Sequence, residues 1–161
     1  MNQSVKIHWL CETALLAAFI TISGALKLPG LFPGTEFQLS APIAVAICGV
    51  FGIKKYLGAG LLASTVGLLL GTQNIFNVLI AMIFRLVVAL VYQGVGKSKF
   101  FYLCAGPLGT FTARLCLGAI LGKAALPLVV AAVPGMLYTA LCSGLIAAAL
   151  EKIKGAAQLR S

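Results

Sequence analysis

Six long runs of apolar residues follow one another along the chain, separated by short breaks that are polar or rich in glycine and proline. They cover roughly residues 10–26, 39–53, 57–71, 75–95, 101–122 and 125–150. Within each run the apolar residues are continuous rather than alternating, which favours helices over the strands of a membrane barrel. A helix needs about 20 residues to cross the hydrocarbon core of a bilayer. We therefore expect an all-α integral membrane protein with six transmembrane helices in a single domain, residues 1–161.

The second and third runs are shorter than the others, with about 15 residues each. They could form two short tilted spans or one re-entrant pair. Gly58 and Gly60 come soon after Lys54 and Lys55. A polar pair followed by glycines is typical of a turn, so we favour two separate spans with the turn in this segment.

Composition supports the membrane assignment. Hydrophobic residues make up 61% of the chain and charged residues 9%, whereas soluble domains have about 45–50% and about 25%. This excludes a soluble enzyme, a disordered regulator and a nucleic-acid-binding domain. Motifs of phosphate-binding loops, serine hydrolases and zinc proteases are missing from the sequence, and His8 is its single histidine. We therefore expect neither an enzyme nor a metal site.

The positions of the charges predict the orientation. The chain has 12 basic and 3 acidic residues, a net charge of +9. With six spans, both termini and the breaks near residues 54–55 and 97–99 share one side. That side carries most of the lysines, and positive residues favour the cytoplasm. Both termini are therefore expected to be cytoplasmic, and the basic excess needs no nucleic acid to explain it.

Two charges remain inside the apolar runs, Arg85 and Arg114. Placing an arginine at mid-bilayer costs at least about 2.5 kcal/mol, so such residues usually face a bundle interior and have a partner. The rise of a helix puts Arg85 about 15 Å from the outer end of the fourth run and Arg114 about 20 Å from the inner end of the fifth. They could contact backbone carbonyls, reach toward the interface, or bind an anionic ligand. The presence of two favours the ligand.

Other polar residues accompany these arginines. Asn74 and Asn77 fall on or near the helical face of Arg85, and Thr110 lies one turn before Arg114. The sequence predicts a cavity between the fourth and fifth helices. The outer break 27–38, which contains Glu36 and Gln38, could cover this cavity, or its apolar residues could dip into the bilayer interface. Gln73, Asn74 and Asn77 could equally cap the fourth helix, and for Asn74 capping is the better explanation.

The chain resembles the substrate-binding (S) components of energy-coupling-factor transporters. The resemblance covers nearly the whole chain in size and six-helix layout, and its most specific part is the run Thr13-Ala14-Leu15-Leu16-Ala17-Ala18. Phe37-Gln38-Leu39-Ser40 and Phe51-Gly52 also look similar. The resemblance implies an S-component bundle in which Ala14, Ala17 and Ala18 dock on a coupling membrane subunit.

The same resemblance implies a function in the plasma membrane of a prokaryote. The chain would capture a vitamin, a vitamin precursor or a related metabolite outside the cell. The coupling subunit and two ATPase subunits would drive uptake, so ATP would be used by the partners and no cofactor by this chain. Two alternatives stay open: a solitary transporter of the same shape, similar to small tryptophan-uptake proteins, and a membrane scaffold or assembly protein without a small ligand.

Overall fold

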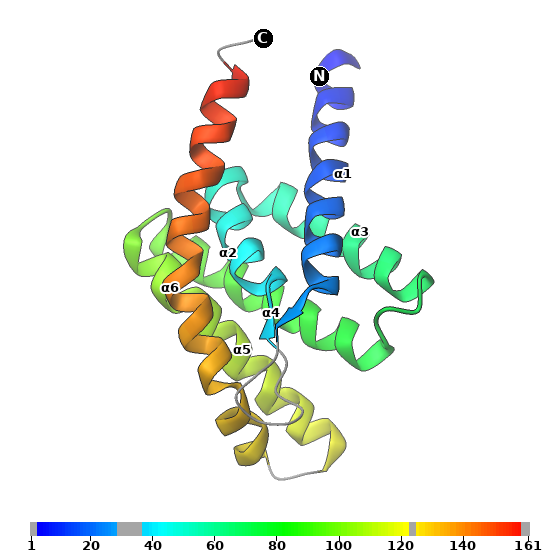
Figure 1. The fold of residues 1–161 in the computed structure, drawn as a ribbon, viewed down its shortest axis with the longest axis vertical. Coiled ribbons are helices and arrows are strands. Elements are labelled where there is room, and N and C mark those ends of the chain that lie inside the picture. Colours follow the sequence, from blue (N-terminus) through cyan, green and yellow to red (C-terminus); the bar gives the residue numbers. More distant parts are fainter. Residues whose placement is uncertain (1–2, 29–36, 123–124, 159–161) are drawn as a thin grey trace.

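The structure is a computed structural model that describes residues 3–28, 37–122 and 125–158. These residues form six helices and one short antiparallel ladder (Figure 1). The helices are α1 (Gln3–Ala25), α2 (Ser40–Phe51), α3 (Ile53–Leu69), α4 (Ile75–Val95), α5 (Lys99–Leu121) and α6 (Ala125–Gln158). The predicted all-helical architecture is confirmed, and α1 and α6 extend well beyond the apolar runs that predicted them.

The ladder lies in the break between the first two helices. β1 (Lys27–Leu28) pairs with β2 (Phe37–Gln38), with Lys27 opposite Gln38 and Leu28 opposite Phe37. Continuous apolar runs gave no reason to expect strands, and these two residues on each side lie outside the runs. The ladder therefore differs from the prediction only in this break, where it places the end of α1 beside the start of α2.

The turn between α2 and α3 is formed by Gly52 alone. Its φ is +83°, a conformation that residues with a β-carbon rarely adopt. The predicted turn between two helices is confirmed, but it lies at Gly52 and not near Lys54 and Lys55, which belong to α3 together with Gly58 and Gly60. Gly52 accounts for the chain reversal, which leaves the later glycines free to serve helix packing.

The short helix α2 is the centre of the bundle. Every residue from Pro42 to Val50 is buried, and α2 contacts all five other helices. At 12 residues it is about 18 Å long, much shorter than the hydrocarbon core of a bilayer. Four helices, α1, α4, α5 and α6, are long and apolar enough to cross a membrane. Of the six expected transmembrane helices, four therefore have the length of a full span, while α2 and α3 are shorter, with 12 and 17 residues. The short helix α2 is enclosed by protein instead of lipid.

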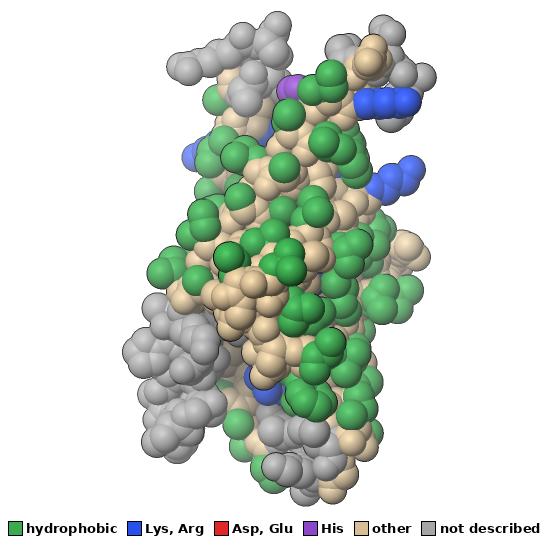
Figure 2. Space-filling model, turned by 90° about the vertical axis from the view of Figure 1, so that its right-hand side faces the viewer, with side chains coloured by type: hydrophobic (Ala, Val, Ile, Leu, Met, Phe, Trp, Pro, Cys, Tyr) green, Lys and Arg blue, Asp and Glu red, His purple; other side chains and the backbone are tan. Residues whose placement is uncertain are grey.

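The outer surface of the bundle is apolar. Leu15, Leu69 and Leu145 are each more than 70% exposed, and Figure 2 shows hydrophobic side chains spread along the face of the molecule. An apolar surface this extensive indicates contact with a membrane. The helices thus associate with lipid on the outside while Val45, Ile47, Tyr56, Val88 and Phe101 form the core.

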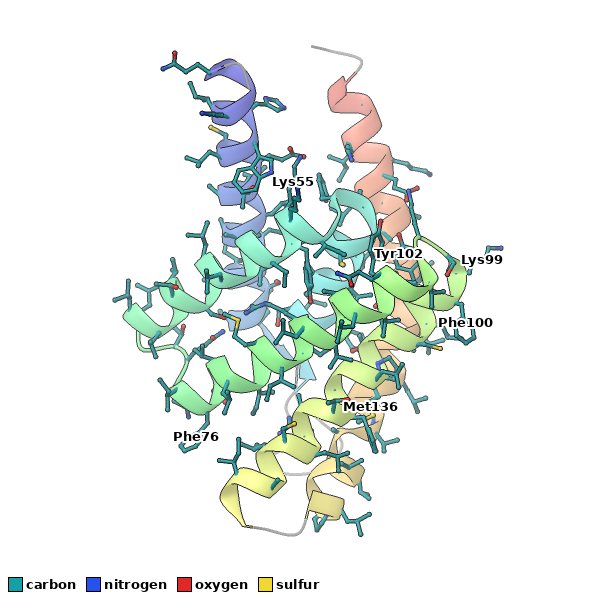
Figure 3. The ribbon with its side chains drawn as sticks, turned by 180° about the vertical axis from the view of Figure 1, so that it is seen from behind. Lys55, Phe76, Lys99, Phe100, Tyr102 and Met136 are labelled. Carbon is teal, nitrogen blue, oxygen red and sulfur yellow. The ribbon has the colours of Figure 1, made fainter. Side chains whose placement is uncertain are left out.

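Both termini lie at one end of the molecule (Figure 1). Seen from behind, Lys55 lies toward that end, Lys99 lies near the middle height of the molecule, and Phe76 at the start of α4 lies toward the other end (Figure 3). Lys154 Nζ donates to the carbonyl oxygen of Val50 at 3.0 Å and lies 5.0 Å from the centre of the Phe51 ring. A cation at this position satisfies the C-terminal carbonyls of α2. Some of the basic excess at this end therefore stabilises the fold.

Candidate functional site

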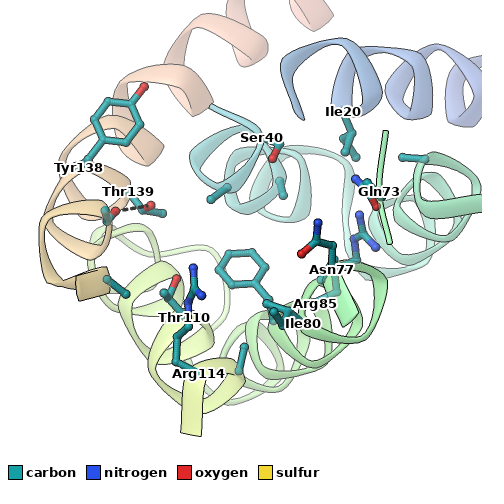
Figure 4. Close-up of a pocket in the computed structure, with 18 of the residues that line it drawn as sticks. Ile20, Ser40, Gln73, Asn77, Ile80, Arg85, Thr110, Arg114, Tyr138 and Thr139 are labelled. Carbon is teal, nitrogen blue, oxygen red and sulfur yellow. Dashed lines mark hydrogen bonds between the residues drawn. The ribbon is translucent and has the colours of Figure 1, made fainter. Parts of the chain in front are cut away.

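A cavity of about 290 Å³ opens among the helices and contains both arginines (Figure 4). Its wall is built from α1, α2, α4, α5 and α6, with Ala63 of α3 and Gln73 from the turn before α4. It is thus wider than the predicted space between α4 and α5. The structure brings together four of the residues that the sequence singled out, Arg85, Arg114, Asn77 and Thr110. That they bind a ligand stays a prediction.

Arg85 is held against α3. Its side chain is 5% exposed, and Nη1 donates a 2.6 Å hydrogen bond to Ser64 Oγ. A β-carbon built on Gly60 would overlap the Arg85 side chain, so the missing side chain of Gly60 is what gives the guanidinium its place. Gly60 and Ser64 are one helical turn apart and therefore face α4 together. Arg85 thus joins α4 to α3 while its remaining donors stay at the cavity.

Arg114 enters the cavity from a different side. Thr110 lies one turn before it on α5, so both side chains share a face of that helix. Figure 4 shows Arg114 and Thr110 on one side of the cavity and Arg85, Asn77 and Gln73 on the other. The Oε1 atom of Gln73 is buried and has no hydrogen-bond partner among the described residues. The cavity therefore offers a cation with two amide side chains on one side and a cation with a hydroxyl on the other.

Counter-charges for the two arginines are scarce. The three acidic residues of the chain are Glu12, Glu36 and Glu151. Glu12 pairs with Lys55, and Glu151 pairs with Lys97 at 2.6 Å. Glu36 lies outside the described residues, so it could serve one arginine at most. Across residues 3–28, 37–122 and 125–158, no ion pair joins Arg85 or Arg114 to a carboxylate.

Asn74 caps α4, as its position predicted. Its Oδ1 accepts a 2.8 Å hydrogen bond from the backbone N–H of Asn77. The side chain is thereby turned back onto its own helix end, and Asn74 is not among the residues that line the cavity. The proposed ligand contact at Asn74 therefore loses its geometric basis, whereas Asn77 keeps it.

The remaining predicted residues are placed as follows. Gln38 belongs to β2, but its side chain and the whole of Glu36 lie outside the described residues. On α1, Ala14 and Ala18 are exposed, while Ala17 is buried in the core. Ala14 and Ala18 therefore share an outward face, and Ala17 packs within the chain.

Sequence reasoning missed the polar residues that α2 and α6 bring to the cavity, Ser40, Tyr138 and Thr139. Thr139 Oγ1 donates to the carbonyl oxygen of Gly135 at 2.8 Å, so it has a local partner. The sequence offered one indication of these cavity residues, because they are polar residues within apolar runs. That indication is weak for hydroxyl side chains, since they can bond to the preceding turn of their own helix.

Comparison with known proteins finds one informative relative. No family model and no solved structure matches the chain. A protein of Lysinibacillus sphaericus named Protein BioX is 51% identical over 131 residues, which is 81% of this chain and 79% of that protein.

Proposed function

Since this chain belongs to the family of Protein BioX, we propose that it is a membrane-embedded substrate-binding subunit for a small, anionic, biotin-related metabolite. The observation that carries this proposal is the presence of Arg85 and Arg114 in one cavity of a membrane protein. A buried cation is costly unless it is paired. A carboxylate on the ligand supplies the pairing, and the guanidinium fork suits carboxylates through two parallel hydrogen bonds.

The biotin assignment rests on the name of the relative, whose prefix is that of biotin genes. The cavity agrees with a small metabolite in size, because its volume lies at the lower end of the range of about 300–1,000 Å³ for small-molecule sites. Biotin itself carries a carboxylate. The anionic group and the size of the cavity thus point to the same class of molecule.

Uptake in this proposal depends on partners. The chain binds the metabolite outside a prokaryotic cell, with both termini in the cytoplasm, and a coupling subunit with two ATPase subunits drives release inside. The outward face of Ala14 and Ala18 supports a close helix–helix contact, because small residues let helices approach each other in lipid. The chain performs no covalent chemistry in this scheme.

Reconstitution with and without the energising module tests the proposal. We expect ATP-dependent uptake into vesicles only when the chain, the coupling subunit and both ATPases are present. Native mass spectrometry of the chain purified from cells should detect a retained small acid. Uptake by the chain alone would instead establish a solitary transporter. Failure to bind any small acid would favour a scaffold.

A further inference from the structure

We propose that the ligand carries two carboxylates joined by an apolar chain, with one carboxylate bound at Arg85 and the other at Arg114. This inference rests on the proposed function and specifies its substrate class. It starts from the number of charges in the cavity. Two guanidinium groups line one cavity, and Glu36 could neutralise one of them at most.

Each end of the cavity has donors for a carboxylate. Arg85 uses Nη1 for its contacts with Ser64 Oγ and the sulfur of Met82, and its guanidinium has further N–H donors on Nε and Nη2. Asn77 lines the cavity on the same side (Figure 4). At the other end Arg114 has Thr110 beside it on α5, which offers a hydroxyl donor. Two polar ends of this kind match two separate anionic groups better than one.

One part of the cavity wall is apolar, while Ser40, Tyr138 and Thr139 make another part polar. Ile80, Ala81 and Phe84 of α4 and Ala113 of α5 line the cavity together with Ala44 of α2. Phe84 is seated against α5, where a β-carbon on Gly109 would lie 2.8 Å from its ring. Since these side chains have no groups to bond a polar linker, the part of the ligand that lies along them should be a hydrocarbon.

A linear α,ω-dicarboxylic acid combines these features. Its two carboxylates match the two arginines, and its methylene chain matches the apolar part of the wall. A ligand with a single carboxylate leaves one arginine of the cavity without a counter-charge unless Glu36 supplies it. The chemistry of the cavity therefore selects against replacing either carboxylate by a neutral group.

The binding experiment uses the full chain purified in detergent and a homologous series of dicarboxylates from succinate to sebacate. Each acid is compared with its monomethyl ester by calorimetry, and biotin serves as a natural monocarboxylate. We expect one chain length to bind best. Its monomethyl ester should bind about tenfold to hundredfold more weakly, because a charge-assisted hydrogen bond is lost.

The second part of the binding experiment removes one positive charge from the protein. Arg114→Gln is the main variant, since Arg85 also joins α4 to α3 and its loss disturbs folding. In Arg114→Gln the best diacid and its monomethyl ester should bind with nearly equal, weakened affinity. Lys54→Gln, which removes one exposed cation away from the cavity, should preserve the preference for the diacid and so control for net charge.

The outcomes separate this inference from the proposed function. If biotin or a monomethyl ester binds the unaltered protein as tightly as any diacid, the dicarboxylate inference is wrong while the substrate-binding function stands. If the diacid preference survives in Arg114→Gln, the second carboxylate is not at Arg114 and the inference is also wrong. If no acid binds saturably, both the inference and the proposed function fail.

Discussion

The guanidinium of Arg85 lies against Gly60, in the space that a β-carbon at residue 60 would occupy. One glycine of α3 thus makes room for the charged side chain of α4. The fit connects helix packing to the cavity, because Arg85 can line the cavity only while α3 and α4 stay this close.

Gly60→Ala should therefore destabilise the protein. The added methyl group displaces Arg85, and overpacking of a tight contact costs about 1–3 kcal/mol. Gly58→Ala is the matched control, since its β-carbon would meet Thr13 Cγ2 at an ordinary 3.4 Å. Thermal unfolding in detergent should show a lower midpoint for Gly60→Ala and an unchanged or higher one for Gly58→Ala. Equal midpoints would contradict the packing described here.

Ser64→Ala should also weaken the α3–α4 contact. It removes the acceptor of the 2.6 Å bond from Arg85 and leaves a buried N–H group unpaired, which costs about 1–3 kcal/mol. Thr65→Ala is the control on the same helix, because Thr65 is exposed and bonds only the carbonyl oxygen of Leu61 among the described residues. Unfolding midpoints measured side by side test the difference. A loss as large in Thr65→Ala would mean that helix propensity, not Arg85, sets the effect.

Substitution of Asn74 should lower the stability of the protein, whereas substitution of Asn77 should weaken ligand binding. Asn74→Ala removes the N-cap of α4 and should cost about 1 kcal/mol of stability, while Asn74→Asp retains an acceptor and much of that stability. Asn77→Ala keeps the backbone N–H that the cap uses and alters the cavity instead. It should weaken binding of the retained acid with little change in unfolding. The reverse pattern would place the ligand contact at Asn74.

Substitutions of Ala14 and Ala18, on the outward face of α1, should affect assembly with the coupling subunit but not the stability of the isolated chain. Ala14→Leu and Ala18→Leu add bulk to exposed positions, so the isolated chain should keep its unfolding midpoint while recovery with the coupling subunit falls. Ala17→Leu adds the same bulk to a residue that is 7% exposed and should instead destabilise the chain itself. Pull-down and unfolding of the three variants distinguish the two roles. Normal recovery with Ala14→Leu and Ala18→Leu would exclude this face from docking.

Cysteine labelling in intact cells tests the orientation. With the five native cysteines replaced by serine, Lys99→Cys should be protected from an impermeant reagent added outside. Thr72→Cys, in the turn between α3 and α4, should be labelled. The expected pattern follows from the lysines at the end of the molecule that carries both termini. External labelling of Lys99→Cys would reverse the orientation.

Much of this protein can be predicted from local sequence. Continuous apolar runs specify helices, because a backbone in lipid must satisfy its own hydrogen bonds. The charges Arg85 and Arg114 stand out within those runs, since burial of a cation requires a partner. The cap at Asn74 follows from one side chain and the N–H group three residues later. Each of these features depends on residues that are neighbours along the chain or on one helix.

Other features depend on how helices from distant parts of the sequence pack. The turn at Gly52, the burial of α2 at the centre and the fit of Arg85 over Gly60 result from the positions of whole helices. Ser40, Tyr138 and Thr139 reach the cavity for the same reason. Helical periodicity shows which face of a helix a residue occupies but not which neighbour that face meets. The sequence therefore predicted a cavity at Arg85 and Arg114, and only the tertiary structure decided which residues of α1, α2, α3 and α6 complete its wall.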